Sequence, residues 1–260
     1  MSVDSERLSS VDSWAEIWSE TDYKEMPSLS TRRGFGRDLE KAMCRHLRGM
    51  QDHSFLEVGC YPGRFLRFFA ERFELRVDGI EYVEERAKHC GQMLKRSGHQ
   101  GEIFAADLFS WGPGRTWDVV ASFGLVEHFE DTAGVLQHHL DLTSPGGFVV
   151  LTFPNHHGMY GRIMKRVAPD RYVMHNQMSL QDALRAANTL RDVDVVEGTY
   201  LGRVGFGTSR LYEWAAASRK RWPKAIVFAA RVIERLGSIL PNSSSLSPHV
   251  LLVLRLKDRR

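Results

Sequence analysis

The sequence is poor in cysteine and contains no long apolar run. Cys44, Cys60 and Cys90 are the only cysteines among 260 residues, and they form neither a C-x-x-C pair nor a metal-binding spacing. We therefore expect neither a disulfide framework nor a metal site, and a reducing cytoplasmic location fits best. No stretch approaches the ~20 apolar residues of a membrane span, and the first residues lack the basic start and apolar run of a signal peptide.

The chain also lacks a strong excess of charge of either sign. With 35 basic and 32 acidic side chains, the formal net charge is +3, which gives no general attraction to nucleic acid. Residues 1–25 carry seven acids against two bases, whereas residues 210–235 carry seven bases against two acids. Because Trp214, Trp222 and Phe228 lie in the basic segment, it is either a solvated face beside a packed helix or a peripheral contact with anionic lipid or an acidic substrate.

The stretch from Phe55 to Gly63 is the most informative one present. A buried-strand pattern at 54–58 leads into a turn with Gly59 and Gly63, and a helical pattern follows at 64–72. Glycine lets the backbone turn sharply and approach a ligand where a Cβ atom would collide. The N–H groups at the start of the helix point toward the same loop. This arrangement predicts a cofactor-binding loop.

Short apolar runs then alternate with helical periods, a pattern typical of β-α units around a parallel sheet. Strands are expected at 54–58, 76–80, 102–106, 117–122, 147–153, 193–197 and 250–256. Helices are expected at 11–21, 35–47, 64–72, 83–96, 131–142 and 179–190, the last one capped by Ser179. The sequence thus predicts an α/β fold with two leading helices.

Four regions are expected along the chain. They are an N-terminal helical cap at 1–50, a cofactor-binding core at 51–198 with a cap loop at 155–177, a helical insertion at 199–247, and a last strand of the core at 248–260. The insertion is longer than most connections between neighbouring strands, so it is expected to form an extra helical element, which Pro223 begins or kinks.

Ligands of open α/β sheets bind beyond the carboxyl ends of the strands, so the residues that end each strand are considered together. Glu81 ends the second strand, and its carboxylate can accept two hydrogen bonds from a ribose diol. Asp107 ends the third strand and can accept a hydrogen bond from an exocyclic amine. The fourth strand leads into the segment from Ser122 to His128.

These segments, in this order, resemble the class I S-adenosylmethionine-dependent methyltransferases over most of residues 53–198. Residues 57–63 resemble the family's E-x-G-x-G-x-G loop, except that Tyr61 stands where the middle glycine is usual. Residues 122–128 are similar to the S-x-G-x-L-E-H version found in small-molecule methyltransferases, and residues 144–147 match the turn into strand five.

The resemblance implies S-adenosylmethionine as the cofactor and a Rossmann-like, seven-stranded, mostly parallel sheet with helices on both faces and a reversed last hairpin. It assigns twelve residues to the cofactor: Glu57, Gly59, Cys60, Tyr61, Gly63, Glu81, Tyr82, Asp107, Leu108, Ser122, Phe123 and Gly124.

The sulfonium of this cofactor carries an excellent leaving group, so the protein mainly has to hold a nucleophile in line with the methyl group. His128 is the candidate base because an imidazole takes up a proton near neutral pH. It could instead pack against the cofactor or cap a helix. His156, His157, Tyr160 and His175 lie in the expected cap loop. Of these, His157, Tyr160 and His175 are assigned to the acceptor pocket.

The expected function is methyl transfer to an oxygen or nitrogen of a small-molecule metabolite in a biosynthetic pathway. Nucleic acid is not expected as the acceptor, because no [D/N]-P-P-[Y/F] motif follows the fourth strand and no Pro-Cys nucleophile is present. Two alternatives remain open. A nicotinamide-dependent oxidoreductase shares the glycine loop and the acid after strand two. A non-catalytic cofactor-binding module is the other, since Tyr61 alters the loop.

Overall fold

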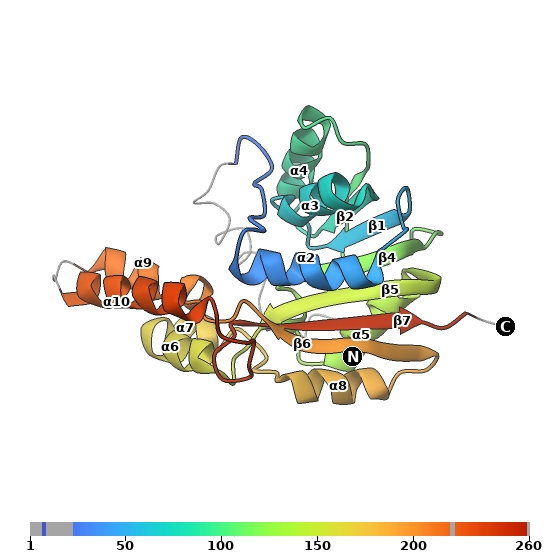
Figure 1. Cartoon of the computed structure of the whole chain (residues 1–260). Coiled ribbons are helices and arrows are strands. Elements are labelled where there is room, and N and C mark those ends of the chain that lie inside the picture. Colours follow the sequence, from blue (N-terminus) through green and yellow to red (C-terminus); the bar gives the residue numbers. More distant parts are fainter. Residues whose placement is uncertain (1–6, 9–22, 219–221, 259–260) are drawn as a thin grey trace.

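A seven-stranded sheet in the order β3-β2-β1-β4-β5-β7-β6 forms the centre of the molecule (Figure 1). The structure is a computed structural model that describes residues 7–8, 23–218 and 222–258. The strands are β1 (Ser54–Val58), β2 (Arg76–Glu81), β3 (Ile103–Ala105), β4 (Trp117–Phe123), β5 (Thr143–Pro154), β6 (Val193–Leu201) and β7 (His249–Leu256). Only β7 runs antiparallel to its neighbours, β5 and β6. The predicted sheet and its reversed last hairpin are confirmed.

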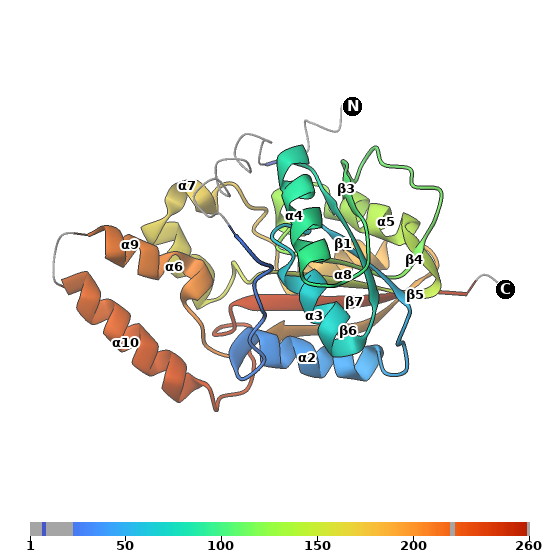
Figure 2. The ribbon, with the colours of Figure 1, turned by 90° about the horizontal axis from the view of Figure 1, so that it is seen from above.

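Helices cover both faces of this sheet (Figure 2). One face carries α2 (Gly34–His46), α3 (Arg64–Phe73) and α4 (Glu84–Arg96), and the other carries α5 (Thr132–Asp141) and α8 (Leu180–Asn188). All five lie within two residues of their predicted bounds. Ser179 caps α8 by accepting from the Asp182 N–H, as expected. The helix predicted at 11–21 lies outside the described residues.

Two parts of the chain contain more regular structure than the sequence predicted. Strand β6 continues to Leu201, because it pairs along its whole length with β7 as far as His249. The cap loop contains two helices, α6 (Met159–Val167) and α7 (Pro169–Tyr172).

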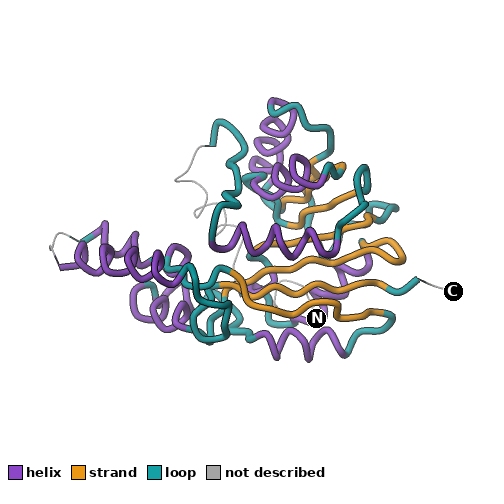
Figure 3. Tube along the Cα trace, viewed as in Figure 1, coloured by secondary structure: helices purple, strands orange, loops and turns teal. Residues whose placement is uncertain are grey.

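The insertion after β6 contains α9 (Leu211–Ala217) and α10 (Trp222–Gly237), and Pro223 lies at the start of α10. Figure 3 shows these helices, with α6 and α7, as a group beyond one end of the strands. A small apolar core holds the group together, and its buried members are Val204, Phe206, Leu211 and Ala230.

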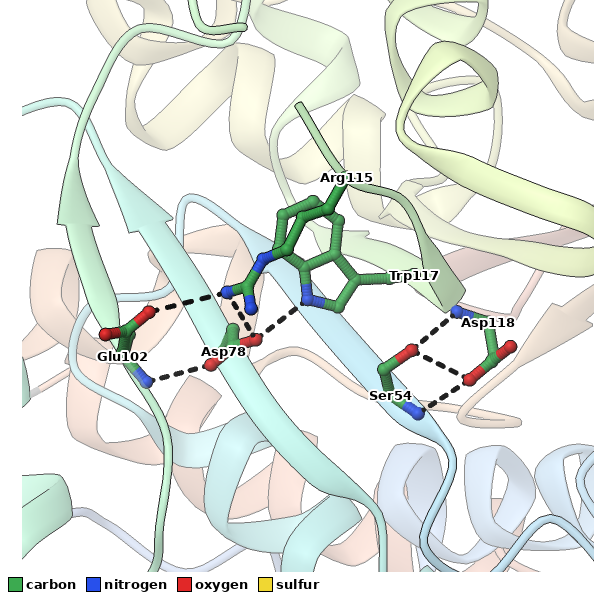
Figure 4. Close-up of polar contacts among 6 residues, drawn as sticks. All are labelled: Ser54, Asp78, Glu102, Arg115, Trp117 and Asp118. Atoms are coloured by element: carbon green, nitrogen blue, oxygen red, sulfur yellow. Dashed lines mark hydrogen bonds and ion pairs between the residues drawn. The ribbon is translucent and has the colours of Figure 1, made fainter. Parts of the chain in front are cut away.

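Side-chain hydrogen bonds tie the strands together on the side away from their carboxyl ends (Figure 4). The indole Nε1 of Trp117 on β4 donates to Asp78 Oδ2 on β2 at 2.8 Å, across the intervening β1. Asp78 Oδ1 accepts from the Glu102 N–H at 2.8 Å. Asp118 Oδ2 accepts from the Ser54 N–H at 2.8 Å and from its hydroxyl at 2.7 Å. These contacts hold β1, β2 and β4 in register, so their carboxyl ends meet at one edge.

Candidate active site

A cavity of about 250 Å³ lies beyond the carboxyl ends of β1, β2 and β4. The strand order reverses between β1 and β4, which is where open α/β sheets bind their ligands. His128, from the short 3-10 helix η2 (Val126–His128), also lines the cavity. Ten of the twelve residues assigned to the cofactor line it: Glu57, Gly59, Cys60, Tyr61, Glu81, Tyr82, Asp107, Leu108, Phe123 and Gly124.

The glycine loop turns at two left-handed positions, Gly59 with φ of 74° and Gly63 with φ of 86°. The N–H groups of Gly59 and Cys60 donate to the Ile80 carbonyl at 2.9 and 3.1 Å, which joins the loop to β2. Gly63 does not line the cavity. A Cβ atom there would lie 2.6 Å from Met26 Cε, so this glycine serves the entry into α3 and its contact with Met26.

Tyr61 fits the loop because the sharp turns fall at the glycines on either side of it. Its phenol ring meets Tyr23 edge to face at 6.1 Å between centroids, and the guanidinium of Arg86 lies 5.1 Å from the ring centroid. Its N–H donates to Glu81 Oε2 at 3.3 Å. The residue that departs from the usual glycine pattern therefore helps to position the acid at the end of β2.

Two acids at the cavity are held by backbone donors. Glu57 Oε2 accepts from the Leu66 N–H at 3.0 Å, which ties β1 to the first turn of α3. Glu81 Oε1 accepts from the Val83 N–H at 3.2 Å, in addition to its bond from Tyr61. Burial raises the pKa of both carboxyl groups. The hydrogen bonds fix the orientation of both side chains before a ligand enters.

Arg7 reaches the third acid of the site, a contact that the sequence did not predict. Its Nη2 donates to Asp107 Oδ1 at 2.5 Å, and its guanidinium lies 4.5 Å from the ring centroid of Tyr82. The Leu8 N–H donates to the His128 carbonyl at 2.9 Å. Arg7 thus borders the cavity. Arg7 and Asp107 are 100 residues apart, and no local pattern marks such a pair.

Ser122 lies behind the cavity rather than in its wall, in contrast to the predicted role. Its hydroxyl donates to His139 Nε2 at 3.1 Å, and His139 Nδ1 donates to the Val135 carbonyl at 2.8 Å. Successive side chains of a strand point to opposite faces, so Ser122 faces α5 while Phe123 faces the cavity. Ser122 therefore supports the site from its far side.

A cluster of histidines adjoins the cavity at His128. The rings of His128 and His175 lie 4.6 Å apart between centroids, and His175 Nδ1 lies 3.1 Å from His156 Nε2. Tyr160, on α6, meets His156 edge to face at 5.7 Å between centroids. Within residues 7–8, 23–218 and 222–258, no group of three or more histidine, cysteine and acidic side chains could hold a metal ion.

The member of the adjacent histidine pair that enters this cluster is His156, not His157 as predicted. His157 is exposed, and its Nε2 lies 2.7 Å from the Gln177 carbonyl oxygen. His156 is buried directly after β5. Adjacent residues leave a strand end in different directions, and the sequence does not state which one turns inward. The assignment of His157 to the acceptor stays a prediction.

His128 and Glu127 form a neutral buried pair. Burial, followed by the charges of neighbouring histidines, lowers the pKa of His128 to about 3. Burial raises the pKa of Glu127 to about 8. His128 Nε2 and Glu127 Oε1 lie 4.0 Å apart, which would suit an ion pair, but the two pKa values leave both groups uncharged at neutral pH. The pair offers an unprotonated imidazole beside a carboxylic acid.

Solved structures similar to this chain share its fold at low sequence identity. A [4+2]-cyclase named SpnF has a TM-score of 0.62 and 13% identity, with 88% of each chain covered. Coclaurine N-methyltransferase, bound to N-methylheliamine and SAH, has a TM-score of 0.56 and 14% sequence identity, with 84% of this chain and 71% of that chain covered. Geranyl diphosphate C-methyltransferase from Streptomyces coelicolor A3(2) has a TM-score of 0.55 and 16% sequence identity, with 85% of this chain and 79% of that chain covered. These proteins are named for different reactions, so the fold does not specify the chemistry.

Sequence comparison is more specific. The ubiquinone biosynthesis O-methyltransferase of Leptothrix cholodnii is 35% identical over an alignment of 104 residues, which covers 38% of this chain and 43% of that protein. The match thus spans less than half of the relative. A family model described as a methyltransferase domain matches residues 10–197, and it decides against the nicotinamide-dependent oxidoreductase. Since that match covers most of the 260 residues, the chain belongs to the class I S-adenosylmethionine-dependent methyltransferases.

Proposed function

We propose that this protein transfers a methyl group from S-adenosylmethionine to an oxygen or nitrogen of a small-molecule acceptor, and that oxygen is the better fit. The observation that carries the proposal is the position of His128: this buried, uncharged imidazole lines the same cavity as Glu81 and Asp107. When bound, the cofactor supplies an electrophilic methyl group on a sulfonium. The residues of the chain then have to hold the acceptor in line and receive its proton.

The lining of the cavity fits the cofactor's groups. Glu81 presents a fixed carboxylate to a ribose diol, and Asp107 an acceptor to an adenine amine. A side chain at Gly59 would enter the space over the loop, where Leu125 Cδ1 already lies 3.3 Å from the ideal Cβ position. We assign the methionine part to the loop that contains Gly59, Cys60 and Tyr61, since these residues line the cavity beside Glu57.

The preference for oxygen follows from proton chemistry. A neutral amine attacks through its lone pair, whereas a hydroxyl group must lose a proton as it becomes methylated. The imidazole of His128 lines the cavity, where it can lie against a bound hydroxyl group and accept that proton.

The direct test is transfer of labelled methyl from S-adenosylmethionine to a panel of phenols, alcohols and amines. We expect hydroxyl compounds to be methylated and the label to appear as an ether. Tight cofactor binding without transfer to any member of a broad panel would favour the non-catalytic module. Transfer to amines alone would contradict the preference for oxygen.

Glu81→Gln tests the cofactor site separately. We expect the dissociation constant for S-adenosylmethionine to rise about 10- to 100-fold, because the amide replaces a carboxylate that accepts from the ribose hydroxyls. Calorimetric titration measures it, with NAD as a ligand that should not bind. Glu85→Gln, which changes an exposed acid on α4, is the matched control and should bind like the parent. Equal affinity in Glu81→Gln would remove the ribose assignment.

A further inference from the structure

Helix α10 packs on the protein through a single narrow row of residues. Gly237 lies against Val204, where an added Cβ atom would come within 2.5 Å of Cγ2. Glu234 Oε1 accepts from the Phe206 N–H at 2.7 Å. These positions repeat at helical spacing, so they lie on one side of the helix. The row that faces the protein consists of Pro223, Val227, Ala230, Glu234 and Gly237.

The opposite side of α10 is apolar and exposed. Phe228 is 71% exposed and Leu236 is 68% exposed, and Ile239, just beyond the helix, is 84% exposed. A surface helix normally turns its apolar stripe toward the core, and here the stripe points away from it. We call this face the outer apolar face; its residues are Trp222, Ile226, Phe228, Val232, Ile233 and Leu236.

Basic side chains run along one flank of the outer apolar face. Lys224, Arg231 and Arg235 are exposed and follow each other at helical spacing. The single acid of α10, Glu234, is turned toward the protein by its bond to Phe206. The acid of α9, Glu213, pairs with Arg210. The flank therefore carries a net positive charge, since the described acids of α9 and α10 are engaged with Arg210 and with the Phe206 N–H.

The same flank borders a hollow of about 530 Å³ between α10, the start of α2 and the turn after β6. Four arginines line it: Arg33, Arg203, Arg231 and Arg235. Figure 2 shows α10 at the outer rim of the molecule, with α6 and α9 between it and the sheet. A flat surface can therefore reach the outer apolar face without meeting the core.

We propose that α10 docks on membranes that contain anionic phospholipid. The outer apolar face enters the headgroup region, and Lys224, Arg231 and Arg235 meet the lipid phosphates. No helix within the described residues has the length and apolar character to cross a bilayer, so the contact lies on the surface. A second copy of the chain fits less well, because it would bring the two positive flanks toward one interface. The proposal does not depend on the methyl-transfer reaction.

The test is co-sedimentation of the full chain with vesicles of phosphatidylcholine alone or mixed with phosphatidylglycerol, at low and high salt. We expect binding to the anionic vesicles that salt weakens. The triple variant Lys224→Gln/Arg231→Gln/Arg235→Gln should bind about a hundredfold more weakly. The affinity of Phe228→Asp/Leu236→Asp for these vesicles should fall by a comparable factor, because the two apolar side chains that enter the headgroup region are replaced.

Two matched variants test the location of the contact. Lys41→Gln/Lys95→Gln/Arg96→Gln removes three exposed charges outside α10, and Val173→Asp changes an apolar residue that is 67% exposed on another element. Both should bind vesicles like the parent. Absence of binding to anionic vesicles at low salt would overturn the proposal, as would equal losses in the control variants. If the parent forms a dimer, binds no vesicles, and becomes a monomer in the variant Phe228→Asp/Leu236→Asp, then α10 is a contact between two copies of the chain instead.

Discussion

Replacement of His128 by alanine is expected to lower the turnover number by about 10²- to 10⁴-fold, the usual contribution of a general base. The imidazole is buried at the cavity, and burial lowers its pKa to about 3, so it is unprotonated at neutral pH. The affinity for S-adenosylmethionine should change much less than turnover, since Glu81 and Asp107 are untouched. Single-turnover kinetics with saturating cofactor separates these two quantities.

The pH profile tests the protonation state of His128, and the alanine variant tests its role as a base. A histidine with an ordinary pKa near 6.5 would lose activity as the pH falls through that value. His128 should not, so the parent's turnover should stay level between about pH 6 and 7.5. His53→Ala, which removes an exposed histidine near the start of β1, is the control and should match the parent. Unchanged turnover in His128→Ala would refute the role of His128 as a base.

Acid should unfold this protein at a higher pH than its carboxylates alone would predict. Burial lowers the pKa of five histidines, to about 3 for His128 and His156 and to about 4 for His139, His175 and His249. Each folded pKa lies below the unfolded value of 6.5, so the unfolded chain binds more protons as the pH falls. The stability is fully present above pH 6.5 and is lost toward the folded pKa values.

The loss of stability in acid is large, because each fully buried histidine can lower the free energy of unfolding by up to about 3 kcal/mol at pH 4. Since domains are stable by only about 5–15 kcal/mol, we expect unfolding at a pH between about 4 and 6. Glu57, Glu81 and Glu127 act in the opposite direction, because burial raises the folded pKa of each carboxyl group, to about 8 for Glu127. Their contribution to stability is fully present below the unfolded value and is lost as the pH rises from there through the folded pKa. Stability should therefore be greatest near about pH 6.5.

Urea unfolding at a series of pH values measures this dependence. His139→Gln is the informative variant, because His139 is fully buried and apart from the cavity, bonded to Ser122 and Val135. Below pH 6.5 the stability of this variant should fall less steeply with pH than that of the parent, because unfolding then takes up about one proton fewer. This difference in slope is expected even if the variant is less stable overall. His53→Gln removes an exposed histidine and should keep the parent's slope. A parent whose stability is flat between pH 6.5 and 4 would contradict the prediction.

The sheet and most of the cavity were predictable because their signals are local. Parallel strands place their carboxyl ends at one edge, so a residue that ends a strand, such as Glu81 or Asp107, is found from strand position alone. Ser122 does not line the cavity, and the reason is again local. Neighbouring residues of a strand point to opposite faces of the sheet, so a shift of one residue changes which face a side chain lies on. The motif at 122–128 does not state where the strand ends.

The sequence by itself thus determined the fold class and the acids at the strand ends, since periodicity and strand-end positions depend on neighbouring residues. The cofactor followed from the resemblance of these motifs to the methyltransferase family. Only the tertiary structure decided which histidine of the 156–157 pair is buried, that Arg7 meets Asp107, and that the apolar side of α10 points outward. A helical period shows that one side is apolar. The direction in which that side faces depends on contacts such as those of Val204 and Phe206, which lie far away in the chain.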